Sequence, residues 1–446
     1  MKRFFLAMAA MAAFVVQMNA GGYQINLLSA KQNGMGQTGT ALKLGSESMI
    51  FNPAGMAFMN DKVDFSSTLA ALSTSYTATY STTNDKYKTD NPIIMPFAVI
   101  LGYSITVNLK AGVSFYTPSG ANTKWDDAWE GAIVNQSFKL SAYTIQPTIA
   151  WRITPKLSVG AGLNITWGSM RLAKGEVSYE VISMILMYKG YDQTVIHQFN
   201  SATMPIAFRY NAVSDASLGF NVGAMYDINN QWTIGASYRS KVNLKLNDGI
   251  TTVVYMNELA REAIKETFPL YEGVKFSTEM PCVSVLSVGG SYKHDDRLTV
   301  AADVRLSFWK QYKKLDIEYT SGELDGYNRV IYKNYRNSWT FNVGGEYKLS
   351  NSVDLRAGVT FDTSPVRKDF CNPELPDMSK VEPSVGFSYR PIKNLSIDAS
   401  VIYIGGLTRK GASVGYSKYG YSANCKFPAD YTLSGWCPSV GVSLAF

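Results

Sequence analysis

The chain has 446 residues, of which 46% are hydrophobic, 13% aromatic and 17% charged, with a formal net charge of +7. This composition excludes a disordered protein, and it excludes a polytopic helical membrane protein because only one apolar run approaches the length of a transmembrane helix. The positive charge is spread along the chain, so we expect no nucleic-acid partner.

Residues 1–20 have the layout of an export signal. Lys2 and Arg3 give a positive start, the stretch 4–16 is apolar, and Ala20 places a small residue before two glycines. An apolar stretch of this length is too short to span a membrane. The sequence therefore predicts a secretory signal peptide over residues 1–20.

Residues 21–60 lack the alternating pattern that follows them and are rich in glycine. Gly34, Gly36 and Gly39 lie close together, and Asn52-Pro53-Ala54 comes near the end of the segment. Glycine permits tight turns in a confined space. A compact insert of this kind suits a plug inside a wide barrel, although a periplasmic linker fits the composition equally well.

The remainder of the chain, residues 61–446, repeatedly alternates apolar residues with small or polar ones. In the segment 157–168, Leu157, Leu163 and Trp167 belong to an apolar face, and the other face carries serine, asparagine, threonine and glycine. A period of two indicates β-strands, and the polar second face does not pack against an apolar core. Aromatic residues at the ends of such faces are typical of a membrane–water boundary. The same pattern recurs in 218–226, 232–238, 298–308, 339–347, 353–361 and 395–403.

The connections between these segments alternate between short and long. Short turns at one end and long loops at the other are typical of an outer-membrane barrel, and counting hairpins gives about fourteen strands, those between 62 and 151 being less clearly marked. A soluble β-sandwich would need a second sheet to cover the apolar faces. The tight turns lie at 154–156, 227–231, 294–297, 349–352 and 390–394, and the long segments at about 175–215, 247–273, 311–336, 364–379 and 406–432.

The last residues support the same fold. Val440, Val442, Leu444 and Phe446 alternate with small residues, and barrel-assembly machinery recognises a final strand that ends in an aromatic residue. We therefore predict an all-β fold class. It is a transmembrane antiparallel β-barrel of about 14 strands over residues 61–446, in the outer membrane of a Gram-negative-type envelope.

Short motifs along the chain point to a family. In chain order they are Gly21-Gly22-Tyr23-Gln24-Ile25-Asn26, Asn52-Pro53-Ala54, Tyr238-Arg239-Ser240, Trp309 with Gln311-Tyr312, and Phe361-Asp362-Thr363-Ser364-Pro365-Val366. Together, and in this order, they resemble the FadL/TodX family of long-chain fatty-acid transporters. The resemblance covers nearly the full mature chain.

The resemblance implies a barrel whose lumen is plugged by an N-terminal hatch, residues 21–60, which begins near Tyr23. Hydrophobic substrate would be caught at an outer groove, pass to a pocket inside the barrel, and leave sideways where the third strand kinks inward. Asn52, Pro53 and Ala54 match the family's hatch motif beside that kink.

The kink itself is expected at Pro118, Ser119 and Gly120. Gly120 falls where the family has its kink glycine, and Pro118 lacks the N–H that ladder pairing needs. An ordinary loop start at the outer end of the strand is the alternative for these three residues.

A carboxylate head group would favour a cation inside the barrel. The resemblance aligns Arg336 with a basic position near the family's internal pocket, and Arg305 lies on the inward phase of its strand. An inter-strand salt bridge is the alternative role for each. Near Trp167 the chain has Ser169 and Arg171 where the family more often has Arg and then Lys. The natural ligand therefore stays open between a fatty acid, an aromatic hydrocarbon and another lipid.

Two long connections are candidates for an outer hydrophobic groove. The segment 181–187 is unusually apolar for a loop, and 256–268 has helical spacing of its apolar residues. An exposed apolar loop usually indicates binding, and methionine adapts to flexible chains. Packing of the two loops on each other is an alternative that does not exclude binding. The candidate groove residues are Ile182, Met184, Ile185, Leu186, Leu259 and Ile264.

The cysteines give no metal or cofactor site. Cys282, Cys371, Cys425 and Cys437 match no zinc pattern, so we expect neither a metal nor another cofactor. If all four form disulfides, three pairings are possible, and unpaired buried thiols fit equally well.

Catalysis is the competing class of function. Of the two histidines, His197 lies in a long loop and His294 in a tight turn, so neither stands on a strand beside a serine, and no G-x-S-x-G elbow is evident. We therefore expect no enzyme activity, a lipid-acting barrel enzyme being the least favoured reading. A general diffusion porin for small polar solutes is the nearer alternative, and a structural or adhesive barrel the third. The sequence predicts a monomeric channel for passive uptake of long-chain fatty acids or similar hydrophobic molecules. Its partners would be that ligand, outer-membrane lipid and the barrel-assembly machinery.

Overall fold

A computed structural model describes residues 22–126, 129–177, 179–196, 206–255, 258–264, 273–326, 328–412 and 427–446. The predicted signal peptide, residues 1–20, lies outside the described residues. The strands are β1 (Val63–Ala70), β2 (Ser73–Tyr80), β3 (Lys86–Lys88), β4 (Phe97–Ser104), β5 (Leu109–Tyr116), β6 (Gly120–Lys124), β7 (Ser137–Arg152), β8 (Leu157–Val177), β9 (Ile206–Val213), β10 (Ser217–Asp227), β11 (Trp232–Arg239), β12 (Val242–Tyr255), β13 (Lys275–Cys282), β14 (Val285–Lys293), β15 (Leu298–Ser307), β16 (Lys314–Tyr319), β17 (Asn328–Tyr332), β18 (Ser338–Lys348), β19 (Val353–Asp362), β20 (Lys380–Ile392), β21 (Leu395–Gly406), β22 (Arg409–Ala412) and β23 (Ala429–Ala445). The helices are α2 (Ala30–Asn33), α3 (Ser48–Phe51), α4 (Tyr179–Tyr188), α5 (Gln193–Ile196) and α6 (Glu258–Ile264), with short 3-10 turns η1 (Gly45–Glu47), η2 (Pro53–Phe58), η3 (Trp309–Gln311), η4 (Gly322–Leu324) and η5 (Lys368–Phe370).

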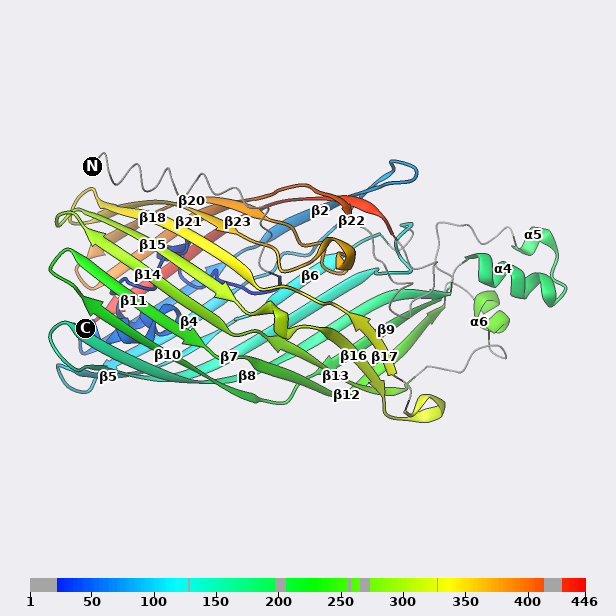
Figure 1. Cartoon of the computed structure of the whole chain (residues 1–446), viewed down its shortest axis with the longest axis horizontal. Coiled ribbons are helices and arrows are strands. Elements are labelled where there is room, and N and C mark those ends of the chain that lie inside the picture. Colours follow the sequence, from blue (N-terminus) through cyan, green and yellow to red (C-terminus); the bar gives the residue numbers. More distant parts are fainter. Residues whose placement is uncertain are drawn as a thin grey trace.

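Many of these strands are consecutive pieces of one longer strand, because neighbouring pieces pair with the same partner. β1 and β2 both pair with β23, and β5 and β6 both pair with β7. Counted in this way, the sheet is an antiparallel barrel of 14 strands (Figure 1). The barrel closes where β23 pairs with β1 on one side and with β21 on the other. The predicted all-β barrel is therefore confirmed.

The two ends of the barrel differ as the connections predict. At one end the strands are joined by short turns at 105–108, 153–156, 228–231, 294–297, 349–352 and 393–394. The other end carries the long connections and, with them, α4, α5 and α6 (Figure 1). Three of the expected long connections contain strands: β9 lies within 175–215, β16 and β17 within 311–336, and β22 within 406–432. On β16, Leu315 and Ile317 are buried and Lys314 is exposed, so the sheet continues there with a polar outer face.

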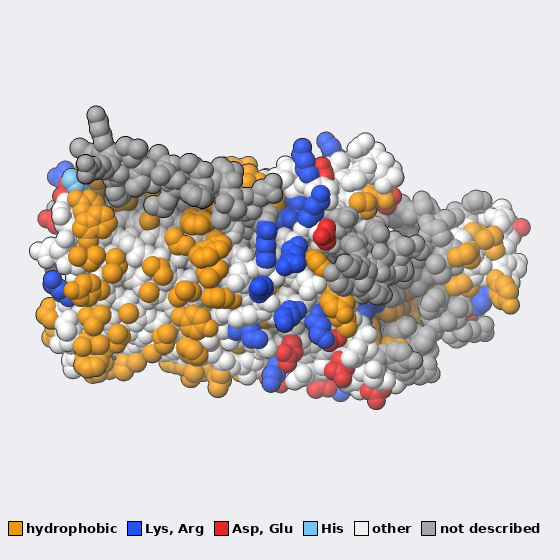
Figure 2. Space-filling model, in the orientation of Figure 1, with side chains coloured by type: hydrophobic (Ala, Val, Ile, Leu, Met, Phe, Trp, Pro, Cys, Tyr) orange, Lys and Arg blue, Asp and Glu red, His pale blue; other side chains and the backbone are white. Residues whose placement is uncertain are grey.

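The outer face of the barrel carries a broad apolar band that begins near the short turns (Figure 2). Ile149, Leu163 and Val288 lie on it with 45% to 52% of their surface exposed. A soluble protein would not leave so many large apolar side chains in water, so this band is the surface that faces lipid. Among the described helices, none combines the length and the apolar character that a membrane crossing requires.

The inside of the barrel is occupied by residues 22–60, here called the lumenal segment, which includes α2, η1, α3 and η2. Inward-facing glycines leave room for its backbone. A Cβ on Gly344 would lie 2.0 Å from the carbonyl oxygen of Met35, and a Cβ on Gly160 would lie 2.5 Å from the carbonyl carbon of Pro53. The small and polar face of the strands is thus the face that contacts the lumenal segment.

Candidate functional site

The third spanning strand, formed by β5 and β6, is interrupted at residues 117–119. Both pieces pair with β7, so Pro118, Ser119 and Gly120 lie within the spanning strand and not at a loop start. At the interruption this strand pairs with the lumenal segment. The N–H of Ile25 donates to the carbonyl oxygen of Pro118 (3.0 Å), and the N–H of Gly120 donates to the carbonyl oxygen of Tyr23 (2.9 Å).

The neighbouring strand is irregular at the same level. Pairing between β4 and β5 ends at Ala98 and Tyr116, followed by one bond from the N–H of Thr117 to the carbonyl oxygen of Phe97 (3.2 Å). The next backbone contact runs from Asp90 to Lys124, and between them no backbone hydrogen bond joins 91–96 to 118–123, all of which are described. Two prolines, at positions 92 and 96, remove further donors there. The sequence analysis identified one side of this break through Pro118-Ser119-Gly120. The two prolines at positions 92 and 96 are the sequence feature that marks the other side, which the analysis missed.

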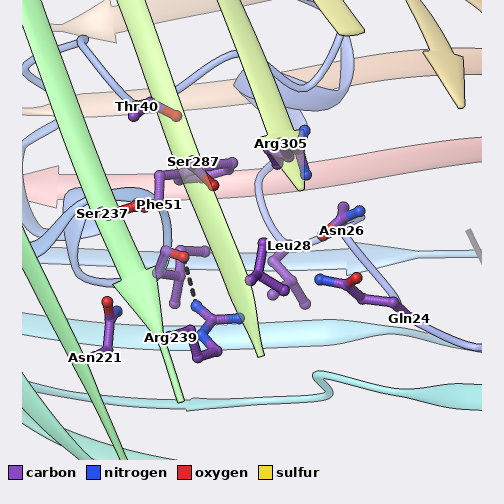
Figure 3. A pocket seen from close by; sticks show the side chains of 12 residues that line it. Gln24, Asn26, Leu28, Thr40, Phe51, Asn221, Ser237, Arg239, Ser287 and Arg305 are labelled. Atoms are coloured by element: carbon purple, nitrogen blue, oxygen red, sulfur yellow. Dashed lines mark hydrogen bonds between the residues drawn. The ribbon is translucent and has the colours of Figure 1, made fainter. Parts of the chain in front are cut away.

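Three cavities surround the first residues of the lumenal segment, and Gln24 lines all of them. The central cavity lies against β10, β11, β14 and β15 (Figure 3). The kink cavity is lined by Pro118 and Ser119. The wall cavity lies behind the break and is lined by Ile94 and by residues 120–123. The interruption in the barrel wall therefore adjoins two of these internal cavities.

Arg239 lines both the central and the kink cavities. One of its guanidinium nitrogens, Nη2, donates to the carbonyl oxygen of Ile50 (2.7 Å, dashed in Figure 3), and its guanidinium carbon lies 5.5 Å from the ring centre of Tyr116. Its Nε is buried without a hydrogen-bond partner among the described residues, and no described carboxylate forms an ion pair with it. A buried donor without an acceptor is costly, so this nitrogen is suited to an anionic ligand atom.

Other unpartnered polar atoms line the kink cavity. Nε1 of Trp309 is a buried donor, and Oδ1 of Asn164 a buried acceptor, for which the described residues supply no partner. The hydroxyls of Thr144 and Thr166, by contrast, pair with each other at 2.8 Å. The cavity therefore combines apolar walls with two open donors, on Arg239 and on Trp309.

The two arginines that the sequence singles out occupy different places. Arg305 lines the central cavity, but its side chain already donates from Nε to Asn342 Oδ1 (3.2 Å) and from Nη2 to the carbonyl oxygen of Gln37 (2.8 Å). Arg336 lines none of the three cavities, and its Nε donates to the carbonyl oxygen of Ser364 (3.3 Å). Sequence reasoning named Arg239 only within a motif and did not assign it a role in the site.

The central cavity and the wall cavity differ in the charge of the residues that line them. The lining of the central cavity includes two arginines and no acidic residue. The wall cavity includes two acids, Asp362 and Glu382, against one cation, Lys380, whose Nζ lies 3.5 and 3.6 Å from their oxygens. A carboxylate is therefore favoured beside Arg239 and disfavoured in the wall cavity.

Comparison with known proteins agrees with this architecture. The family model described as outer membrane protein transport protein (OMPP1/FadL/TodX) matches residues 11–446. The chain belongs to this family. The resemblance found in the sequence motifs is thereby confirmed, as is an outer-membrane location.

Relatives of the OMPP1/FadL/TodX family align at low identity. Outer membrane protein P1 of Haemophilus influenzae is 25% identical over 300 residues, covering 64% of this chain and 61% of that protein, which is less than two thirds of its length. The long-chain fatty acid transport protein of Escherichia coli K12 is 21% identical over 417 residues, covering 90% of this chain and 91% of that protein.

Two solved structures of the family share the fold. A Pseudomonas aeruginosa FadL homologue superposes with a TM-score of 0.78 at 19% identity, covering 96% of this chain and 100% of that one. The toluene transporter TbuX of Ralstonia pickettii superposes with a TM-score of 0.66 at 19% identity, covering 96% and 99%.

Asn52, Pro53 and Ala54, which the sequence analysis predicts to form a hatch motif, hold the lumenal segment together. Nδ2 of Asn52 donates to the carbonyl oxygens of Thr40 (2.7 Å) and Ala224 (3.1 Å), and its Oδ1 accepts the N–H of Ala54 (3.1 Å). Pro53 begins η2 and lies against Gly160. These contacts join two turns of the lumenal segment to the barrel wall.

Tyr23 is buried at the other end of the lumenal segment. Its hydroxyl donates to the carbonyl oxygen of Pro281 (2.7 Å), and its ring packs edge-on against Trp309 at 4.7 Å and Tyr312 at 6.0 Å. Tyr23 thereby fixes the first described residues of the lumenal segment beside the kink cavity.

The candidate groove residues divide between a buried and an exposed set. On α4, Ile182 and Leu186 are fully buried, whereas Met184 is 58% exposed and Ile185 is half-buried. Leu259 on α6 is half-buried, and the side chain of Ile264 lies outside the described residues. α4 packs on α6, as one of the alternatives requires.

The long connection 363–379 packs tightly over the lumen. Lys333 and Glu374 form a buried ion pair at 2.8 Å, and the carbonyl oxygen of Pro373 accepts the indole N–H of Trp125 (2.9 Å). Asp377 accepts hydrogen bonds from the hydroxyl of Ser364 (2.6 Å) and the N–H of Gly22 (3.3 Å). Burial raises the pKa of the Asp377 carboxyl to about 7, although nearby Lys380 lowers it.

The residues considered for other chemistry are dispersed. Cys282, Cys371 and Cys437 are free thiols, and Cys425 lies outside the described residues. His294 lies in the short turn 294–297, and His197 lies outside the described residues.

Proposed function

We propose that this protein is a passive outer-membrane channel for hydrophobic molecules that carry an anionic head group, with long-chain fatty acids as the best fit. Substrate enters from the loop end, occupies the central and kink cavities with its head group at Arg239, and leaves sideways through the break between β4 and the β5–β6 strand. Transport needs no energy source because the ligand moves down its gradient.

The observation that carries this proposal is the break in the wall beside internal cavities. Exposing a sixteen-carbon chain to water costs about 0.8 kcal/mol per methylene, or roughly 12 kcal/mol in all. A straight aqueous pore would require that exposure on the periplasmic side. A route from the kink cavity through the wall leads directly into the bilayer and avoids it.

We propose further that residues 21–60 act as the hatch of this channel. The close fit of the lumenal segment against Gly344 and Gly160 supports this role, since it leaves little room for water between segment and wall. A general diffusion porin requires an open polar bore, and the occupied lumen argues against that alternative. A closed ladder that needs no second copy supports a monomer.

The head-group assignment distinguishes between ligand classes. One relative is named a long-chain fatty acid transport protein, and one structural neighbour is titled a toluene transporter. Toluene offers a donor only its ring face, whereas a carboxylate offers two charged oxygen acceptors to the open Nε of Arg239 and Nε1 of Trp309. The two open donors therefore favour the fatty acid.

Uptake by proteoliposomes tests the proposal. Reconstituted protein should take up a labelled long-chain fatty acid and exclude a small sugar, whereas sugar passage without lipid passage would refute the channel assignment. Arg239→Met should lower fatty-acid uptake and leave toluene uptake largely unchanged. Arg297→Met, in an exposed short turn, serves as the matched control and should affect neither ligand.

A further inference from the structure

Three basic residues lie close together on the outer face of the barrel, and we call them the outer basic triad: Lys139 on β7, Arg171 on β8 and Arg209 on β9. In the sheet register Lys139 stands directly opposite Arg171. Arg209 stands opposite Ala173, which places it diagonally next to Arg171. All three side chains are exposed.

The triad faces the surroundings of the barrel and not its lumen. Strand side chains alternate between the two faces, so Lys139 shares its face with Ile145 and Trp151, which are 38% and 52% exposed. Arg171 likewise shares its face with Leu163, which is 45% exposed. The triad is therefore continuous with the apolar band that contacts lipid.

An aromatic pair on the same face shows how high the triad lies relative to the membrane. Tyr143 and Trp167 lie opposite each other on the same outer face, with ring centres 6.2 Å apart. Such rings mark the membrane–water boundary. Lys139 and Arg171 lie four residues further toward the loop end, or about 13 Å along the strands. The triad therefore stands at the level of lipid head groups in the outer leaflet, as does the Lys and Arg band on the face seen in Figure 2.

Among the residues that the structure describes, no acidic side chain forms an ion pair with the triad. Like charges directly opposite in a sheet repel each other. Among the described side chains of β7, β8, β9 and the short connection 214–216, Asp215 is the single acid, and it forms no ion pair with the triad.

Two other cations on the neighbouring strands have an acidic residue beside them. Lys275 forms an ion pair with Asp248 at 3.1 Å, and Lys245 stands opposite Glu279 in the register. The contrast indicates that the triad receives its counter-charge from outside the protein.

We propose that the outer basic triad binds the phosphate groups of a phosphorylated outer-leaflet glycolipid of the lipopolysaccharide type. Two guanidinium groups and an ammonium match phosphate in charge and in hydrogen-bonding geometry. Because the triad lies at head-group level, next to a lipid-facing apolar surface, its ligand is a membrane lipid. This inference rests on the barrel and its location and is independent of the proposed transport activity.

The triad also lies beside the break in the wall. Lys139 stands opposite Asn122 of β6, and Gly120 stands opposite Ser141, two residues from Lys139. A glycolipid held by the triad would therefore place its acyl chains next to the break. It would thereby limit access of bulk lipid to that opening.

Binding of defined lipids to the full chain in detergent, followed by native mass spectrometry, tests the proposal. Lipid A with both phosphates should bind at least about tenfold more tightly than phosphate-free lipid A, because each Lys or Arg near anionic lipid contributes several-fold. This comparison uses the unmodified protein, so it holds even if a variant fails to fold. Equal binding of the two lipids would overturn the proposal, and so would equally tight binding of phosphatidylglycerol.

A charge-matched pair of variants locates the site. The triple substitution Lys139→Gln, Arg171→Gln, Arg209→Gln should abolish the preference for the phosphorylated lipid. The control triple Lys156→Gln, Arg297→Gln, Lys393→Gln removes the same charge from exposed positions at the short-turn end and should keep the preference. Loss in both triples, or in neither, would overturn the assignment to the triad, and heat-modifiable migration on gels confirms that each barrel is folded.

Discussion

The carboxyl group of Asp303 joins the lumenal segment to the barrel wall through three hydrogen bonds. Its Oδ2 accepts the N–H of Gly39 (2.7 Å), the N–H of Thr40 (2.9 Å) and the hydroxyl of Thr40 (2.9 Å). Asp303→Ala removes all three. At about 1 kcal/mol net for each bond, the lumenal segment loses about 3 kcal/mol of attachment. Since 1.4 kcal/mol corresponds to a factor of ten, the detached population should rise about 100-fold.

Conductance in planar bilayers and sugar flux into liposomes measure this detachment. Asp303→Ala should conduct small solutes in long openings that the unmodified protein shows rarely. Thr40→Val removes one of the three bonds and should raise the open fraction only about fivefold.

Asp354→Ala is the matched control. It also removes a buried inward-facing carboxylate, but one that pairs with Arg390 and not with the lumenal segment, so its flux should match the unmodified protein. If Asp303→Ala conducts no more than Asp354→Ala, the lumenal segment is not what closes the barrel.

Two further outcomes follow from the same structure. Gly120→Trp should reduce fatty-acid uptake while the barrel still assembles, because even a Cβ at this position would lie 2.9 Å from Cδ1 of Ile25. Unchanged uptake would reject a sideways route. Because burial raises the pKa of Asp377 to about 7, the stabilisation of connection 363–379 is full at low pH and is lost as the pH rises from about 4 through 7. A neutral maleimide labels buried Cys371 when the connection opens, and peptide mass spectrometry measures the labelling rate. This rate should rise with pH more steeply in the unmodified protein than in Asp377→Asn. The same pH dependence of the labelling rate in both proteins would contradict this expectation.

The strands that the sequence predicted well are those that cross lipid on one face and contact the lumenal segment on the other. The segment 157–168 is the clearest case, since its apolar and small faces correspond to these two surroundings along β8. The region 62–151 was harder because its strands are broken. Residues 71–72 separate β1 from β2, and the irregular stretch 89–96 separates β3 from β4.

The candidate site was less accessible to sequence reasoning, for a physical reason. Arg239 and Arg305 both lie on the inward phase of their strands, and nothing in the local pattern distinguishes them. They differ in which part of the lumenal backbone passes beside them. The carbonyl oxygen of Gln37 accepts a hydrogen bond from the guanidinium of Arg305, whereas Nε of Arg239 has no partner among the described residues. The outer basic triad depends in the same way on the register between β7, β8 and β9, which the local sequence pattern does not give.

A photoreactive fatty acid tests the central claim, which is passage of the ligand through the barrel wall. The probe carries a diazirine at its methyl end and is irradiated during uptake into proteoliposomes. We expect crosslinks to residues 92–98 and 117–124, which border the break on its two sides. Crosslinks confined to the short turns 153–156 and 228–231, with none at the break, would show that the ligand leaves along the barrel axis and would contradict the account.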